Sequence, residues 1–274
     1  MVAWEVELCH DRVVVVGGGS GIGRATALRL AELGATVYVL GRRAHALEET
    51  ASRAAGLAGR VIPLVCDARS APDVDGCFVR IEAEGPAQAL AHCAAAVNYV
   101  PARDMSPENF EEVVASTLFT AFNVIHRWAV GLLRSGLSGI GVAVTSAMAP
   151  LGTPGLAHSA SGKAGIEAFI KSVAREWARD GVRVNGLGPG FFPVEKSQDL
   201  WSDDSVSGPI RAQIGLGRLG ALEEIVGPML FLLSRAASYI TGEVLVVDGG
   251  YRLQPEVFPR WTYASEAGSA GPDA

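Results

Sequence analysis

Hydrophobic residues along this chain form short apolar runs that alternate with longer stretches of helical spacing. Such runs are typical of strands in a parallel sheet, because both faces of those strands are covered. Seven runs have this character, and they lie at 13–16, 36–40, 61–65, 87–93, 141–145, 182–185 and 243–250. The alternation of strand and helix predicts an α/β fold with a parallel sheet of about seven strands.

Apolar positions spaced by three or four residues indicate helices between these strands. The longest helical patterns lie at 44–56, at 106–133, around Lys163 up to about residue 180, and at 222–233. The second of them opens with Ser106 and Pro107, a favoured N-cap followed by proline at the first helical position. No period is clean from 191 to 217, which predicts an irregular loop that closes over a substrate.

The alternation of strand and helix continues without a linker or an internal repeat as far as residue 252. We therefore expect residues 1–252 to form a single domain. Residues 253–274 end in a polar stretch of Gly, Ser, Ala and Pro, which predicts a partly disordered tail.

Charge and cysteine usage narrow the class of protein. The 274 residues carry a formal net charge of −6, which argues against nucleic acid and an anionic membrane surface as partners. The four cysteines have no zinc-type spacing, so we expect no metal and a reducing, cytoplasmic location. The N-terminus does not resemble a signal peptide, and no run reaches the roughly 18 apolar residues of a membrane span. A small-molecule substrate is the expected partner.

A run of glycines directly after the first strand is the main candidate for chemistry. Gly17, Gly21 and Gly23 have the spacing Gly-x-x-x-Gly-x-Gly, and a helical pattern follows them. A turn of this kind brings bare backbone and a helix N-terminus to a phosphate, although an ordinary strand-to-helix turn has the same composition. The cofactor-binding residues predicted from this stretch are Gly17, Gly19, Ser20, Gly21, Ile22 and Gly23.

Residues after the next strands bear on the choice of nucleotide. The second strand ends at Arg42 and Arg43 with no acidic residue, which favours the 2′-phosphate of NADP(H) over the free ribose of NAD. Asp67 follows the third strand, where it could accept from the adenine amino group or cap the next helix. Ala94 and Ala95 follow the fourth strand, and their small side chains would let a flat ring or a ribose lie against the backbone.

These motifs together resemble those of the short-chain dehydrogenases/reductases, over about residues 8 to 252. The resemblance rests on the glycine run, Asp67, Ser146, Lys163, Asn185 before Pro189-Gly190, and the ending 240–250. It implies a Rossmann-type, doubly wound parallel sheet and hydride transfer between a nicotinamide and a carbonyl, alcohol or activated alkene. It also implies cofactor contacts from Lys163, Pro189 and Gly190, and a homo-oligomer, either a dimer or a tetramer.

The chain departs from this family where members usually carry an Asn-Ser-Tyr-Lys tetrad. Ser146 and Lys163 are present, but Thr117 stands at the Asn position and Ser159 at the Tyr position. The segments around Cys93 and Lys163 look like those of 2,4-dienoyl-CoA reductases, which also lack a tyrosine four residues before the lysine. Some of those relatives carry a tyrosine near the place of Met148, so that substitute is absent here as well.

Helical geometry limits which residues can replace the tyrosine. Ser159, four residues before Lys163, lies about 40° from it around a helix, whereas His158, five residues before, lies about 140° away. His158 would reach the site only if the helix began later or bulged at Gly162. The candidate catalytic residues are therefore Ser146, Lys163, Ser159, Thr117 and His158.

Two functions remain open at this point. The first is an NADP(H)-dependent reductase of an activated C=C or C=O bond of a small molecule or acyl thioester. The second is a relative that keeps the nucleotide pocket but performs no redox chemistry, acting as a cyclase, an isomerase or a binding protein. The intact cofactor motifs favour the first, and the absent tyrosine favours the second.

Overall fold

The computed structural model describes residues 7–95, 98–195 and 201–253. Seven parallel strands form one sheet in the order β3-β2-β1-β4-β5-β6-β7, which confirms the predicted doubly wound sheet. The strands are β1 (Arg12–Val16), β2 (Thr36–Gly41), β3 (Arg60–Val65), β4 (Ala89–His92), β5 (Gly139–Val144), β6 (Val182–Pro189) and β7 (Val244–Val247).

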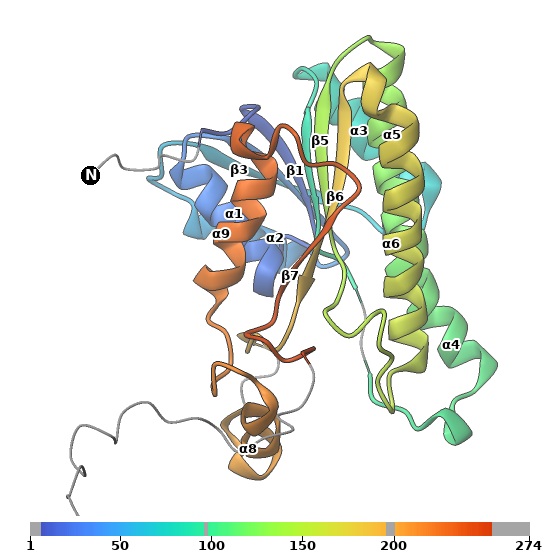
Figure 1. Ribbon diagram of the computed structural model, residues 1–274. Coiled ribbons are helices and arrows are strands. Elements are labelled where there is room, and N and C mark those ends of the chain that lie inside the picture. The colour runs from blue at the N-terminus through green and yellow to red at the C-terminus, as the bar shows by residue number, and fades with distance from the viewer. Residues whose placement is uncertain (1–6, 96–97, 196–200, 254–274) are drawn as a thin grey trace, which may run out of the picture.

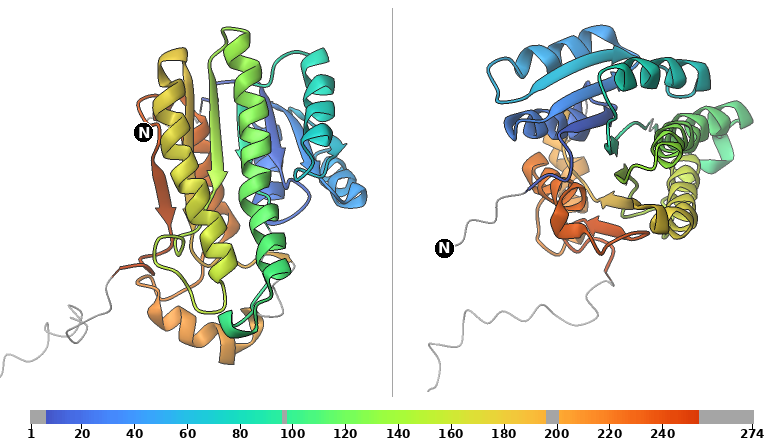
Figure 2. Two further views of the ribbon diagram at one scale, coloured as in Figure 1. Left: turned by 90° about the vertical axis from the view of Figure 1, so that its right-hand side faces the viewer. Right: turned by 90° about the horizontal axis from the view of Figure 1, so that it is seen from above.

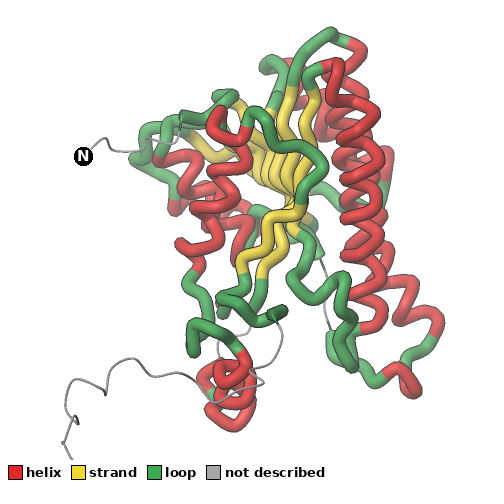
Figure 3. Tube along the Cα trace, in the orientation of Figure 1, coloured by secondary structure: helices red, strands yellow, loops and turns green. Residues whose placement is uncertain are grey.

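Helices cover both faces of the sheet (Figures 1 and 2). One layer consists of α1 (Gly21–Glu32), α2 (Ala44–Arg53) and α9 (Leu222–Leu233). The opposite layer consists of α3 (Ala71–Ala83), α5 (Thr120–Arg134) and α6 (Ala157–Trp177). The shorter helices α4 (Pro107–Val114) and α8 (Asp204–Gln213) lie beyond the carboxyl ends of the strands, at the bottom of Figure 1. Figure 3 shows the strands passing between the two helical layers.

The four consecutive valines of β1 explain why this strand is central. Val13 and Val15 pack into the core beneath α1 and α9, whereas Val14 and Val16 pack into the core beneath α3 and α5. All four are buried, because side chains alternate between the two faces of a strand. The chain runs outward from β1 through β2 to β3 and then returns to β4 on the other side of β1. In sheets of this kind, ligands bind at that reversal, outside the carboxyl ends of the strands.

Two of the predicted boundaries were wrong. The sixth strand continues past residue 185 to Pro189, because Gly186–Pro189 pairs with β7. A Cβ atom on Gly186 would lie 2.9 Å from the Val244 side chain. Glycine normally weakens a strand, but here it allows β6 to pack closely against β7. The stretch 191–217 is not irregular throughout, because α8 occupies Asp204–Gln213 with Asp203 as its N-cap. Residues 196–200 and 254–274 lie outside the described residues.

The predicted helix 106–133 is interrupted by a π-helical turn. Ser106 caps α4 by accepting from the Asn109 amide, as expected. The π turn spans Ala115–Phe119, and α5 continues from Thr120. The whole stretch Pro107–Arg134 is long and apolar enough by composition to cross a membrane, contrary to the expectation from the sequence. Its most buried part, on α5, packs against the sheet, so a position in the protein core explains its composition.

Packing between α5 and β5 depends on glycines in the strand. Trp128 is 2% exposed, and its indole N–H donates to the Ala87 carbonyl at 2.8 Å. A Cβ atom on Gly139 would lie 2.8 Å from the Trp128 ring and would also collide with Leu132. The large aromatic ring therefore reaches the sheet because β5 has no side chain at Gly139.

We expect Gly139→Ala to destabilise the protein by about 1–3 kcal/mol, because it overpacks this contact. In a Trp128→Phe background the smaller ring relieves part of the collision, so the same substitution should cost less. Urea unfolding of the two single variants and the double variant measures the difference. An equal cost in both backgrounds would show that the Trp128 ring does not set the packing limit.

Candidate active site

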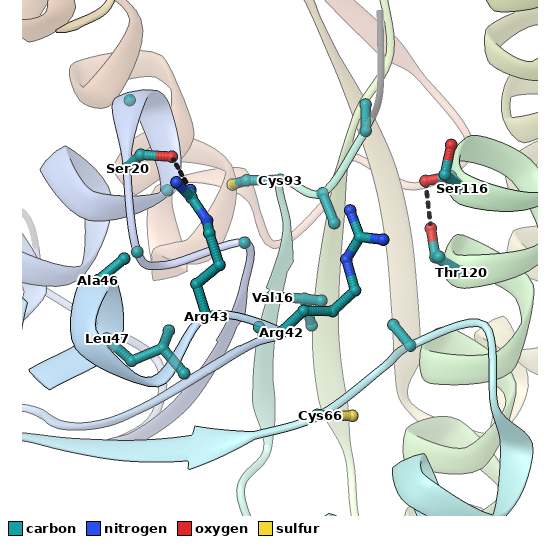
Figure 4. Close-up of a pocket in the computed structure, with 18 of the residues that line it drawn as sticks. Val16, Ser20, Arg42, Arg43, Ala46, Leu47, Cys66, Cys93, Ser116 and Thr120 are labelled. Atoms are coloured by element: carbon teal, nitrogen blue, oxygen red, sulfur yellow. Dashed lines mark hydrogen bonds between the residues drawn. The ribbon is translucent and has the colours of Figure 1, made fainter. Parts of the chain in front are cut away.

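A cavity of about 440 Å³ lies at the carboxyl ends of β1 to β4, where the strand order reverses (Figure 4). Eleven of the predicted cofactor residues line it, namely Gly17, Gly19, Ser20, Gly21, Ile22, Gly23, Arg42, Arg43, Asp67, Ala94 and Ala95. Its wall also contains residues that the sequence analysis did not assign to the site, among them Ala46, Leu47, Cys66, Arg69, Cys93, Ser116, Thr120 and Val194. The predicted nucleotide residues are thus brought together at one site.

The glycine run is required by close backbone approach as well as by turn geometry. Gly17 has a positive φ of 80°, and a Cβ atom there would lie 2.9 Å from the Ala94 amide nitrogen. A Cβ atom on Gly23 would collide with the Gly17 carbonyl oxygen. Only glycine allows the turn to fold onto helix α1 and onto the segment after β4 at once. The turn therefore has a structural reason for its glycines besides any phosphate it binds.

The N-terminus of α1 opens into this cavity. Ser20 is the N-cap residue, and its hydroxyl makes no capping hydrogen bond. Gly21, Ile22 and Gly23, which form the first turn of the helix, all line the cavity. The first N–H groups of a helix have no partners within the helix and carry a positive partial charge. A site of this kind suits a phosphate group.

Three arginines and one aspartate surround the same cavity. Arg43 points toward the Ser20 hydroxyl at 3.4 Å, while Arg42 points into the pocket on the side of Ser116 and Thr120 (Figure 4). Asp67 accepts two hydrogen bonds from the Nε and Nη2 atoms of Arg69, at 3.0 and 2.6 Å. These bonds lower the pKa of Asp67. The net charge of the lining is positive, although the whole chain is acidic.

The proposed capping role of Asp67 was wrong. Ser70 is the N-cap of α3, because its hydroxyl accepts from the Asp73 amide. Asp67 and Arg69 instead form an ion pair in the lining of the cavity, and the Asp67 backbone amide donates to Asp73 Oδ2 at 3.4 Å. Arg69 was not predicted as a site residue. The available signal was its position two residues after Asp67 on the same loop.

Lys163 lies at the carboxyl end of β5, outside the lining of the nucleotide cavity. Its side chain is 5% exposed and donates to the Val144 carbonyl at 2.5 Å. Burial lowers the pKa of the ammonium to about 8, and the adjacent Cys93 thiol opposes this shift. Lys163 therefore holds a positive charge at neutral pH only narrowly, and it lies next to the loop that carries Ser146.

The two serines differ in surroundings. Ser146 is partly exposed at the end of β5, and its hydroxyl accepts from the Met148 amide at 3.2 Å. Ser159 is 8% exposed and lies one helical turn before Lys163 on α6, the same face of the helix. A serine hydroxyl is a far weaker acid than a tyrosine phenol, whose reference pKa is about 10. Both serine hydroxyls are therefore poor direct proton donors.

Thr117 lies within the π turn and packs against α6. Its Cβ and Cγ2 atoms would each be 3.1 Å from a Cβ atom on Gly162, and its buried hydroxyl has no partner among the described residues. Close by, His92 Nε2 lies 3.2 Å from Thr120 Oγ1. Burial, with Lys163 as a second cause, lowers the pKa of His92 to about 3. This histidine is therefore neutral at physiological pH and adds no positive charge beside Lys163.

His158 does not reach the site in the way that was considered. Helix α6 begins at Ala157 and continues through Gly162 without a bulge. Neither the later helix start nor the bulge that would bring His158 to the site is therefore present. The ring is fully buried, with Nδ1 accepting from the Ser159 amide at 2.8 Å and Nε2 lying 2.9 Å from Asn98 Oδ1. Because Nδ1 accepts, the proton is on Nε2 and is donated to Asn98. His158 thus anchors the segment after β4 to the start of α6.

Pro189 ends β6 and Gly190 follows it, and neither residue lines the nucleotide cavity. The Pro189 carbonyl accepts from the Ala147 amide at 3.0 Å, and the Gly190 amide donates to Val247 at 2.8 Å. A Cβ atom on Gly190 would lie 2.7 Å from the Asp248 Cα atom. In this structure the two residues hold the ends of β5, β6 and β7 together, just before the segment that leads to Val194.

The aromatic residues after β6 divide between two environments. Phe191 makes edge-to-face contacts with Trp201 and Tyr251, at ring-centroid distances of 5.6 and 4.9 Å. Phe192 packs beside the core under α9 and against Gly220. Tyr99, in the segment after β4, is 63% exposed and lies against Gly155.

Comparisons with known proteins agree with this geometry. Residues 17–252 match the protein family described as "Enoyl-(Acyl carrier protein) reductase". The chain is 32% identical to gluconate 5-dehydrogenase of Gluconobacter oxydans over 246 residues, covering 89% of this chain and 95% of that protein. It is 33% identical to a "probable 2,4-dienoyl-CoA reductase" of Bacillus subtilis over 251 residues, covering 90% and 98%.

Solved structures give the same result. A short-chain type dehydrogenase/reductase from Mycobacterium marinum is 31% identical, with a TM-score of 0.84 and coverage of 90% of this chain and 98% of that one. A protein from Agrobacterium tumefaciens with bound NADP is 30% identical, with a TM-score of 0.83 and coverage of 89% and 97%. The chain therefore belongs to the short-chain dehydrogenase/reductase family of oxidoreductases.

Proposed function

We propose that the protein is an NADP(H)-dependent reductase that acts on an activated C=C or C=O bond of a small molecule or acyl thioester. The observation that carries the cofactor assignment is the charge of the cavity lining. Arg42, Arg43 and Arg69 line it, and Asp67 is its only acidic residue among those described. Asp67 follows β3 and is paired with Arg69. The residues that line the cavity after β2 are Arg42 and Arg43, so no carboxylate stands there to select the ribose of NAD.

The shape of the cavity supports a dinucleotide as its ligand. The glycine turn and the start of α1 suit a pyrophosphate, and Ala94 and Ala95 leave room beside them. Arginine binds phosphate through parallel N–H donors, so Arg42 and Arg43 would hold the 2′-phosphate. When bound, a nicotinamide supplies a hydride. The presence of NADP in the related Agrobacterium protein is consistent with this assignment.

The choice of an activated acceptor follows from the residues around Lys163. The ammonium is buried and positive at neutral pH, so it stabilises negative charge that develops on a substrate oxygen. Ser146 offers a hydroxyl at the end of β5. With Ser159 in place of tyrosine, a strong proton donor is missing. A conjugated acceptor tolerates this, because its enolate is stabilised by the lysine and can take a proton from water, whereas the alkoxide of a plain ketone needs an acid.

We expect the protein to bind NADP(H) more tightly than NAD(H), and Arg42→Asp to remove or reverse the preference. A hydrogen bond to a charged group contributes roughly 1.5–3 kcal/mol, which corresponds to about ten- to a hundred-fold in affinity. Titration calorimetry with both nucleotides measures this. Arg175→Asp, on the exposed outer face of α6, is the charge-matched control and should leave both affinities unchanged. Equal affinities for NAD and NADP in the wild type would refute the role of Arg42.

Activity should fall as the pH rises through about 8, because Lys163 then loses the proton that gives it a positive charge. The value of kcat/KM from about pH 6 to about pH 10 reports this ionisation. Lys163→Arg keeps its charge over that range, so its activity, although lower, should not show the decline. A profile of the same shape in both proteins would assign the ionisation to another group.

Lys163→Ala should abolish turnover, whereas Ser159→Ala should slow it by less than about ten-fold, since Ser159 is not a direct acid. A conjugated enone or enoyl thioester should be reduced faster than the matching saturated ketone. Steady-state NADPH oxidation with this substrate pair tests both points. Full NADPH oxidation by Lys163→Ala would reject the role of Lys163, whereas no NADPH oxidation by the wild-type protein with either substrate would favour the non-redox alternative.

A further inference from the structure

Arg24 is a buried cation that joins three separate parts of the nucleotide site. It follows Gly23 on α1 and is 5% exposed. Its Nη2 atom donates to the Gly19 carbonyl at 2.6 Å, and its Nε atom donates to the Thr50 hydroxyl at 3.1 Å. Its Nη1 atom lies 2.9 Å from both carboxylate oxygens of Glu195. The glycine turn, helix α2 and the segment after β6 are therefore connected through one side chain.

The first of these connections orients the glycine turn. The Thr50 hydroxyl lies 3.0 Å from the Gly18 carbonyl, so the carbonyls of Gly18 and Gly19 both face the Arg24–Thr50 pair. In a planar trans peptide the N–H points away from the preceding carbonyl. The N–H groups of Gly19 and Ser20 consequently face away from Arg24, toward the cavity that these two residues line. Arg24 and Thr50 thus keep two amide donors available for an anion.

The second connection attaches the segment after β6 to the same turn. Glu195 is held by Arg24, and Arg53 lies 3.5 Å from its other oxygen. The preceding residue, Val194, lines the nucleotide cavity, and its Cγ1 atom would be 3.1 Å from a Cβ atom on Gly21. The Val194–Glu195 end of segment 191–195 therefore lies against the glycine turn and is held there by an ion pair to a residue beneath that turn.

We propose that Arg24 is a positioning residue that couples nucleotide binding to the docking of segment 191–195. The proposal rests on the nucleotide site of the proposed function. A nucleotide that uses the amides of Gly19 and Ser20 favours the orientation that Arg24 imposes, and a docked Glu195 fixes Arg24 in place. Because coupling between two sites is reciprocal, each event stabilises the other.

Two carboxylates on Arg24 provide a matched pair of variants. Glu195 and Glu49 both accept from Arg24, at 2.9 and 2.8 Å, and their side chains are 50% and 46% exposed. Only Glu195 belongs to segment 191–195. Glu195→Gln should therefore accelerate hydrogen exchange of the amides in this segment by at least about five-fold and weaken NADPH binding by about three- to ten-fold, as expected for loss of a charge-assisted bond. Glu49→Gln should change both quantities by less than about two-fold.

Arg24→Lys tests the orientation of the turn. Lysine keeps the charge but cannot reach the Gly19 carbonyl, the Thr50 hydroxyl and Glu195 together, so NADPH binding, followed by its fluorescence, should weaken by at least about ten-fold. Thermal unfolding establishes that the variant is folded. If it is not folded, Thr50→Val decides the point, because it removes the hydroxyl beside Gly18 and leaves Glu195 paired. This variant should weaken NADPH binding without changing exchange in segment 191–195.

Each part of the proposal can fail separately. Exchange in Glu195→Gln that matches Glu49→Gln would overturn the connection to segment 191–195. Unchanged NADPH affinity in folded Arg24→Lys, or in Thr50→Val, would overturn the orientation of the turn. If the wild-type protein binds no nicotinamide nucleotide, the proposed function fails and the coupling with it, while exchange in the free protein still reports whether Glu195 holds the segment.

Discussion

The close contact between the backbone of Gly17 and the backbone at Ala94 is the constraint on which the site depends. A single Cβ atom at residue 17 would lie 2.9 Å from the Ala94 amide nitrogen. This contact is where the chain leaves β1 toward α1 on one side and leaves β4 on the other. Because the two segments meet without side chains between them, the start of α1 lies directly over the reversal in strand order, where α/β proteins bind their ligands.

The electrostatics of the cavity differ in sign from those of the chain as a whole. A net charge of −6 describes the complete sequence, but the cavity collects arginines from the loops after β2 and β3 and the N-terminus of α1. Arg24 adds a buried positive charge beneath the turn, balanced by Glu49 and Glu195. An anionic ligand is thus attracted locally by a protein whose overall charge repels polyanions.

Lys163 and Ser159 are the residues of the site that bear on the redox chemistry we propose. Lys163 on α6 donates to the Val144 carbonyl at the end of β5, and its burial brings its pKa near the physiological range. Four residues before Lys163, α6 presents the short hydroxyl of Ser159. In the function that we propose, Lys163 stabilises negative charge and Ser159 is a poor proton donor, which is why the proposal names an activated acceptor.

Local chemistry explains what the sequence determined by itself. The valine run of β1, the glycines after it, the Ser106–Pro107 helix start and the helix 222–233 were all predicted, because each depends on burial or backbone preferences within a few residues. Tertiary structure decided the rest. Pairing with β7 made a strand of Gly186–Pro189, Ser70 took the cap that Asp67 did not, and His158 was directed to Asn98. Arg24 meets Glu195 across 171 positions of sequence, and contacts of that separation leave no periodic signal because they exist only after the chain has folded.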